Sequence, residues 1–484
     1  MSDNHTVEKY IESYPFLQYI NDNHGQYKHA REAGYKDPND LFMIGESGGF
    51  LLDIRKGDKF VNTNLLTEMA SLYHINGEKY TLYKEDSIPH RQLRKREEHR
   101  RKHGFDAPCF MRNGEVRNLH ISGDMYNYLN YTIIEQLDEK TIIHTDRGSV
   151  AKKKQDFPKF IDAQFWTFAI IEFCELNGFH LLIDKTRRGG FSYIMASHSA
   201  NKINLQPNKV CIHVAADSKY LTKRGGLTDF TIRNLYFYEN KTFFKRGILS
   251  RAAENFTLGF KLPNGDISPN SWNSALFSAS ANNNPDCAIG KDAVSVKTEE
   301  VSTMENFDEY MNVTEPAMRT GSYVTGNLFA WGTATSGNMQ TFERNFYNPS
   351  AFHFIAFENV WDKDSRNEVC GYFKPYCWGL QGQIGDRYAM DADGNSDIEM
   401  GLRIAYKERT DKKVHSKTFS DYINYLGQYA NMPSESFSST SENLFSSEAL
   451  MNWEEVLKND PAYTNISDDG MFFEDADGKV IFKT

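Results

Sequence analysis

The hydrophobic and polar positions of residues 158–216 predict helices that alternate with strands. Ile161 to Leu176 has the pattern of an apolar helix, and the apolar run Phe179 to Asp184 behind it predicts a buried strand. A second helix is predicted from Ser192 to about Ile203, followed by a second buried strand from Lys209 to Ala216. Strands and helices that alternate at this spacing are typical of a parallel α/β sheet.

Two further apolar strands are predicted downstream, and polar residues follow each of them. Ala293 to Val296 is short and β-like, and the adjacent acids Glu299 and Glu300 come soon after it. Leu328 to Trp331 leads into residues 332–337, a polar turn with three hydroxyl side chains. Candidate catalytic and binding residues therefore follow the carboxyl ends of the predicted strands.

Three regions are predicted along the chain. Residues 1–148 form an N-terminal accessory region, 149–350 the α/β core, and 351–484 a smaller lid or linker subdomain. The first region contains a strongly charged segment, residues 91–102, in which arginines and lysines are interrupted by two glutamates. A solvated helix is one interpretation of this segment, and contact with a phosphate backbone or an acidic partner is the other.

Composition narrows the class of protein. The 484 residues are enough for two or three domains, and 40% hydrophobic residues with 14% aromatics predict well-packed cores. A mean hydropathy of -0.60 and the lack of a long uncharged apolar run predict no membrane partner. Six scattered cysteines without a CxxC pair, and no secretory signal, predict a reducing cytoplasm. The net charge of -10 argues against a dedicated nucleic-acid binder but leaves room for a local basic surface.

The segment from Leu181 to Ala196 has the order strand, glycine-bearing basic loop, helix. This order suits a nucleotide phosphate, because backbone N–H groups and the positive end of a helix dipole point at the anion. The standard pattern GxxxxGK[ST] is not met: Gly190 and Ser192 match it, but Phe191 occupies the lysine position. The lysine stands instead at the loop entrance, as Lys185. A basic turn without a ligand is the alternative interpretation.

Glu299 and Glu300 supply the other groups that nucleotide hydrolysis needs. One carboxylate could hold magnesium together with the Ser192 hydroxyl, and the other could polarise the attacking water. Neighbouring side chains on a strand point to opposite faces, so both acids can approach one site only if the backbone turns there. A pair of surface glutamates is the alternative.

Together these segments resemble the ATPase of large terminase subunits, the DNA-packaging motors of tailed bacteriophages. The resemblance covers roughly residues 120 to 450 and includes a glutamine before the loop, Gln164, and a phosphate loop whose lysine has moved to the front. It implies a P-loop NTPase core of the RecA/ASCE-like class that binds ATP and Mg²⁺. The acids form a Glu-Glu pair where the family normally has Asp-Glu.

The resemblance also implies a role for each site residue. Glu300 would be the catalytic base, assisted by Arg188 at the γ-phosphate, and Ser192 and Glu299 would hold magnesium. The residues that would contact ATP are Gln164, Lys185, Thr186, Arg187, Arg188, Gly189, Gly190, Phe191, Ser192, Thr333 and Thr335. Arg224 is a candidate for an arginine donated to a neighbouring subunit.

The implied function is ATP-driven translocation of double-stranded DNA into a procapsid, in the cytoplasm of an infected bacterium. The implied partners are the portal and procapsid, the small terminase subunit and further copies of the chain in a homo-oligomeric ring. Nuclease activity is not predicted, because no nuclease pattern follows the ATPase segments. Two alternatives stay open: a helicase-like or repair ATPase, and a non-catalytic portal-associated scaffold with a degenerate nucleotide site, which the unusual Phe191 would suit.

Overall fold

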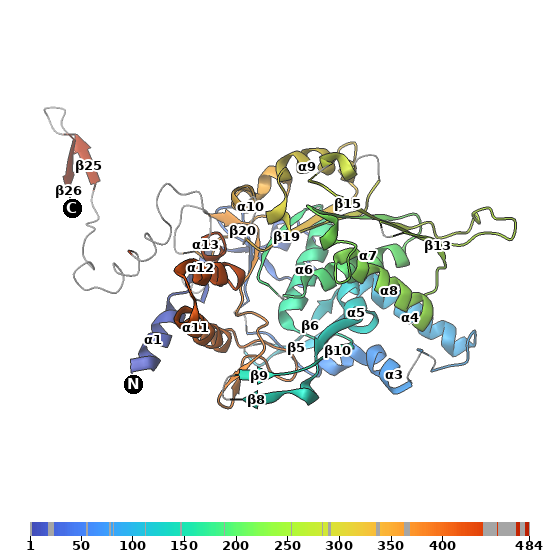
Figure 1. Cartoon of the computed structure of the whole chain (residues 1–484), viewed down its shortest axis with the longest axis horizontal. Coiled ribbons are helices and arrows are strands. Elements are labelled where there is room, and N and C mark those ends of the chain that lie inside the picture. The colour runs from blue at the N-terminus through green and yellow to red at the C-terminus, as the bar shows by residue number, and fades with distance from the viewer. Residues whose placement is uncertain are drawn as a thin grey trace.

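The computed structural model of the chain is shown in Figure 1. It describes residues 2–438 apart from 18–23, 55–56, 77–78, 81, 112, 146–147, 188, 253, 283, 289–291, 335–338 and 363–367, together with residues 453, 471–474 and 480–483. Among these residues, no helix combines the length and the apolar composition that crossing a bilayer would require.

An eight-stranded sheet organises the molecule. Its strands are, in spatial order, β13 (Ile248–Arg251), β14 (Asn255–Leu258), β15 (Ala275–Ser280), β12 (Val210–Ala215), β16 (Ser295–Glu299), β19 (Asn327–Gly332), β11 (Leu181–Lys185) and β22 (Tyr372–Lys374). The strands from β15 to β22 are all parallel, and β14 and β13 extend the sheet in antiparallel fashion. The predicted α/β class with a parallel central sheet is therefore confirmed.

Helices cover both faces of this sheet (Figure 1). One face packs against α6 (Asp162–Asn177) and α7 (Phe191–Leu205), and the other against α9 (Phe307–Thr314) and α10 (Met339–Phe346). Leu181 and Ile183 belong to the first core and Leu182 to the second, as the two-residue period of a strand requires. Burial on both faces explains why Leu181, Leu182 and Ile183 are all apolar rather than alternating with polar residues.

The predicted elements of the core agree with the structure apart from one boundary. Helix α6 and strand β11 lie where the sequence places them. The strand predicted at Ala293 to Val296 instead runs from Ser295 to Glu299. Lys297 and Thr298 made the predicted strand end too early, because polar residues inside a strand resemble the residues that follow one. Both are fully buried, so packing overrides their intrinsic preference for solvent.

Smaller elements surround the core. The helices are α1 (Ser2–Glu12), α3 (Glu68–Asn76), α4 (Ile88–His103), α5 (Gly123–Tyr131), α8 (Leu227–Lys241), α11 (Ile398–His415), α12 (Phe419–Gln428) and α13 (Pro433–Ser436). Short sheets join β1 (Lys28–His29), β2 (Phe42–Ile44), β3 (Phe50–Leu52), β20 (Phe357–Glu358) and β21 (Val369–Cys370), and separately β4 (Lys59–Phe60), β5 (Phe105–Phe110) and β6 (Val116–Ile121). The remaining strand pairs are β7 (Ile134–Leu137) with β10 (Lys153–Asp156), β8 (Ile143–Thr145) with β9 (Gly148–Val150), β17 (Arg319–Thr320) with β18 (Tyr323–Val324), β23 (Gln383–Ile384) with β24 (Arg387–Tyr388), and β25 (Met471–Glu474) with β26 (Val480–Lys483).

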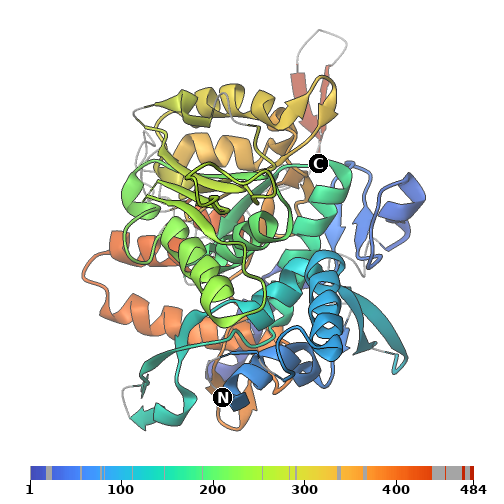
Figure 2. The same ribbon diagram turned by 90° about the vertical axis from the view of Figure 1, so that its right-hand side faces the viewer.

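The segment before residue 148 and the segment after 350 both pack against the core. In Figure 2, α4 and α5 of the first segment lie beside the core helices. From the second segment, β22 pairs with β11 along the edge of the central sheet. The division of the chain at residues 148 and 350 remains a prediction.

The N-terminal segment is joined to the core by a buried arginine. Arg101 of α4 donates from Nε to Asn127 Oδ1 (2.9 Å) and Asn201 Oδ1 (3.1 Å), and from Nη1 to Asn204 Oδ1 (3.1 Å). Its guanidinium also stacks 4.2 Å from the ring centroid of Phe244. Because Asn201 and Asn204 belong to α7, this single side chain ties α4 to a core helix.

Replacing Arg101 with alanine is expected to lower the free energy of unfolding by about 3–5 kcal/mol, because it leaves three buried amides without their donor. Urea unfolding followed by circular dichroism measures the change. Lys102→Ala is the matched control, since it removes an exposed cation from the next position and is expected to change stability by less than about 0.5 kcal/mol. Equal effects of the two substitutions would contradict this role of Arg101.

Candidate active site

The loop between β11 and α7 has the local structure that its glycines predict. Gly190 has φ of 77° and precedes the first residue of α7, and this left-handed conformation suits glycine. Phe191 is only 2% exposed and belongs to the hydrophobic core. The side chain that breaks the standard motif is thus a core residue and not part of a ligand surface. Thr186 is also buried, and the Arg187 amide donates to Gln428 O of α12 (3.0 Å).

Side chains from the ends of three parallel strands and from one helix meet beside this loop. Lys185 Nζ lies 2.9 Å from Glu300 Oε1 and 3.3 Å from Thr333 Oγ1. The Ser192 hydroxyl, in the first turn of α7, donates to Glu299 Oε1. The structure therefore brings together Lys185, Ser192, Glu299, Glu300 and Thr333. They meet because β11, β19 and β16 are parallel neighbours, so their carboxyl ends share one edge of the sheet.

A strained residue lets both glutamates reach this point. Glu300 has φ 53° and ψ 52°, a left-handed conformation that costs a residue with a side chain of the order of 1–2 kcal/mol. Glu299 is the last residue of β16, and the backbone turns immediately after it. The turn reverses the usual alternation, so that the Glu300 carboxylate faces Lys185 while Glu299 faces Ser192. Backbone strain of this kind is typical of functional sites.

The two carboxylates differ in their surroundings. Burial raises the pKa of Glu299 to about 7, although the hydrogen bond from Ser192 acts in the opposite direction. Its second oxygen, Oε2, is buried and makes no hydrogen bond to any described residue. The side chain of Glu300 is 24% exposed and is paired with the Lys185 ammonium.

The orphaned oxygen of Glu299 provides a test of whether the site fits a metal ion. A hydroxyl and carboxylate oxygens are the ligands that Mg²⁺ prefers, and it usually keeps several waters besides one or two carboxylates. Ser192 Oγ and Glu299 supply such a set, with one carboxylate oxygen still lacking a partner. These residues therefore fit Mg²⁺, and the nearby Lys185 ammonium could bind an anion.

Gln164 lies at the other end of the loop. Its Nε2 is 3.4 Å from the Tyr128 hydroxyl, and its Oε1 is buried without a hydrogen-bond partner among the described residues. A Cβ built on Gly190 would lie 3.5 Å from Gln164 Nε2, so the amide adjoins the start of α7. The amide thus has one acceptor available to a ligand.

Three predicted residues are not joined to this cluster. Arg188 and Thr335 lie outside the described residues. Arg224 is exposed in the loop before α8, and no described contact connects it to Lys185 or the glutamates. Their proposed roles remain predictions.

Asp184 is a member of the site region that the sequence reasoning missed. It is fully buried directly before Lys185, and neither carboxyl oxygen makes a hydrogen bond within the described part of the chain. Burial raises the pKa of Asp184 to about 8. The available signal is an aspartate at the end of an otherwise apolar strand, a position that also marks a strand's end.

Comparison with known proteins gives structural neighbours only. No protein-family model and no curated protein matches the chain. Among solved structures, the large terminase ATPase domain of Thermus phage P74-26 matches at 11% identity and a TM-score of 0.31, over 52% of this chain and 87% of that one. The large terminase of bacteriophage HK97 matches at 10% identity and a TM-score of 0.34, over 57% of this chain and 51% of that one. At these values the likeness does not establish a family.

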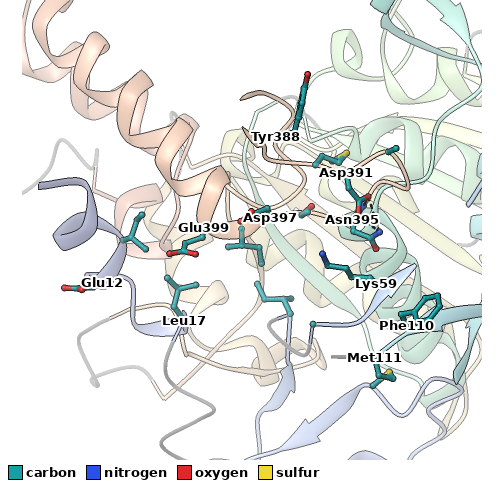
Figure 3. A pocket seen from close by; sticks show the side chains of 17 residues that line it. Glu12, Leu17, Lys59, Phe110, Met111, Tyr388, Asp391, Asn395, Asp397 and Glu399 are labelled. Atoms are coloured by element: carbon teal, nitrogen blue, oxygen red, sulfur yellow. Dashed lines mark hydrogen bonds between the residues drawn. The ribbon is translucent and has the colours of Figure 1, made fainter. Parts of the chain in front are cut away.

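A large cavity lies apart from the cluster. Its volume is about 1210 Å³, and it is lined by α1, β4 and the segment from Tyr388 to Glu399 (Figure 3). Lys59 faces it among several carboxylates, including Asp391 and Glu399. None of the described residues that are predicted to bind ATP lines this cavity.

A second group of possible metal ligands is an ion-pair network. The ligand atoms of Asp124, Glu175 and His198 lie within 4.8 Å of one another. Lys202 Nζ lies 2.7 Å from Glu175 and 3.7 Å from Asp124, so an ammonium already neutralises these carboxylates. The Ser192 and Glu299 pair is therefore the better candidate for a cation.

The raised pKa of Glu299 predicts a pH dependence of stability. A carboxyl group with a pKa of about 7 when folded, and the ordinary glutamate pKa of 4.5 when unfolded, holds its proton more tightly in the native state. Stability is therefore expected to fall as the pH rises from about 4.5 to 7. Glu299→Gln should remove roughly 3 kcal/mol of this fall, as measured by urea unfolding at pH 5 and pH 8.

Glu309→Gln, which removes an exposed carboxylate from α9, controls for the loss of charge. If Glu299→Gln kept the pH dependence of the parent protein, Glu299 would not be the buried acid described above.

Proposed function

We propose that this chain is the ATPase portion of a large terminase, a motor that hydrolyses ATP to translocate double-stranded viral DNA into a procapsid. One observation carries the proposal: a lysine, a hydroxyl, two adjacent carboxylates and a threonine meet at the carboxyl ends of parallel strands. These are the groups that phosphate binding, magnesium binding and water activation require.

The order of the strands supports a P-loop NTPase core of the RecA/ASCE-like class. Strand β19 lies between β11, which leads into the loop, and β16, which ends in the acids. The hydroxyl-bearing end of β19 thus lies between the Lys185 strand and the glutamates, where Thr333 could sense the bound phosphate. Thr335 is proposed to share this role.

Each remaining residue of the loop has a proposed part in binding ATP. Lys185 would exchange its contact with Glu300 for the β- and γ-phosphates, and the backbone of Thr186, Arg187, Gly189 and Gly190 would line the phosphates. Arg188 would contact the γ-phosphate, and Gln164 would accept a hydrogen bond from the adenine amino group through its unpaired Oε1.

Hydrolysis would then depend on the two glutamates in different ways. Ser192 and Glu299 would hold Mg²⁺, which neutralises charge on the phosphates. Once Lys185 has moved to the phosphates, the half-buried Glu300 carboxylate is free to orient a water and accept its proton. Burial of Glu299 and partial exposure of Glu300 suit these separate tasks.

The implied partners complete the proposal. The motor would work as a homo-oligomeric ring with the portal, the procapsid and the small terminase subunit, in the cytoplasm of the infected cell, and Arg224 would reach a neighbouring subunit.

A scaffold with a degenerate site is less well supported, because Phe191 is a core residue and leaves Lys185 in place. A helicase-like ATPase would separate strands without needing a procapsid.

Glu300→Gln is expected to leave ATP binding largely intact and to lower turnover by about 10²- to 10⁴-fold, because the amide cannot accept the proton of water. Phosphate release measures turnover, and calorimetry with a non-hydrolysable ATP analogue measures binding. Glu305→Gln, an exposed acid five residues further, is the matched control and should hydrolyse ATP normally. Unchanged turnover in Glu300→Gln would rule out the proposed base.

A further inference from the structure

The charged helix α4 is held in one orientation by the face it buries. Glu97 and Arg101, one turn apart, are both fully buried. The Glu97 carboxylate accepts hydrogen bonds from the hydroxyls of Tyr126 and Tyr131, and Arg101 binds three asparagines of α5 and α7. These buried contacts prevent α4 from rotating about its axis, so its opposite face stays exposed to solvent.

That opposite face carries a stripe of cations. Arg91, Lys95 and Lys102 are exposed. At 3.6 residues per turn their directions fall within about 40° of one another, and the rise of 1.5 Å per residue spaces them over about 16 Å. None of them forms an ion pair with a described carboxylate, and Arg91 donates to the backbone oxygen of Asp86. These three side chains are called the α4 stripe below.

The one acid of α4 that is not fully buried, Glu98, does not cancel the stripe. Glu98 Oε1 lies 3.7 Å from Arg94 Nε and 3.1 Å from Arg246 Nη2, so its charge is balanced by other arginines. The stripe is therefore locally positive in a chain whose net charge is -10. A general excess of positive charge cannot explain it.

We propose that the α4 stripe binds the phosphate backbone of double-stranded DNA without reading its sequence. The choice of duplex DNA rests on the proposed function, and the stripe supplies the site. Duplex DNA carries one negative charge per about 1.7 Å of axis, so a rigid row of cations 16 Å long can contact several phosphates. Single strands are bound with the help of exposed stacking rings. The stripe offers none, since Phe105, Tyr126 and Tyr131 pack on the helix's inner side.

The position of the stripe also connects it to the nucleotide site. Arg101 holds Asn201 and Asn204 of α7, and the first turn of the same helix carries Ser192. DNA bound on α4 would therefore contact a helix that is joined, through Arg101, to the helix that begins at the phosphate loop.

The test compares two triple variants of the full chain that lose the same charge. Arg91→Gln, Lys95→Gln and Lys102→Gln remove the α4 stripe. Lys407→Gln, Lys413→Gln and Lys417→Gln remove three exposed lysines on and just after α11, on the opposite side of the molecule in Figure 1. Binding of a short labelled DNA duplex of arbitrary sequence is measured by fluorescence anisotropy over a series of salt concentrations.

The stripe variant is expected to bind more weakly at low salt, and its slope of log affinity against log salt should be shallower by about 2.7, because each lost phosphate contact releases about 0.9 fewer counterions. The α11 variant should keep the slope of the parent chain. Equal losses in both variants, an unchanged slope in the stripe variant, or a parent chain that binds no duplex at low salt would overturn the inference.

ATP hydrolysis without DNA separates this inference from the proposed function. If the parent chain and the stripe variant hydrolyse ATP equally but bind DNA equally too, the stripe is not the site and the proposed function stands. If the parent chain binds DNA through the stripe but hydrolyses no ATP, the proposed function fails and the stripe stands.

Discussion

The ion pair between Lys185 and Glu300 depends on the register of three parallel strands. Lys185 ends β11, Glu300 follows β16, and β19 lies between them with Thr333 just beyond its end. Asp184 pairs with Gly332 and Glu299 with Trp331, so the three strand ends lie at nearly the same level. A slip of one residue in either pairing would turn these side chains to the opposite face of the sheet.

The site adds energetic costs that the rest of the fold must offset. Asp184 and Glu299 are buried carboxyl groups with raised pKa values, and Glu300 has a strained backbone. Strands β11 and β19, which form the middle of this site, contribute residues to both hydrophobic cores. Cores on both faces of the sheet fix the backbone well enough to keep these unfavourable groups in place. Backbone strain and buried carboxyl groups with raised pKa values often occur together at functional sites.

The sequence predicted the elements whose pattern is set locally. The apolar run of β11, the apolar helix pattern of α6 and the glycines before α7 each depend on neighbours in the chain, and each lies where it was expected. The convergence of Lys185 with Glu300 was expected from the resemblance, whereas the left-handed turn that makes it possible was not predictable, because glutamate has no preference for that conformation. The burial of Glu97 and Arg101 could not be predicted from the sequence either. Their partners are distant in sequence, so a uniformly charged helix gave no sign of which charges point inward.

Lys185 is proposed to bind a nucleotide phosphate where the ends of these strands meet. Calorimetric titration of a non-hydrolysable ATP analogue in the presence of magnesium, into the parent chain and into Lys185→Ala, tests it most directly. We expect the parent chain to bind the analogue and the variant to lose at least about tenfold in affinity, since one charge-assisted contact to phosphate contributes roughly 1.5–3 kcal/mol. Equal affinities, or no binding by the parent chain, would contradict it.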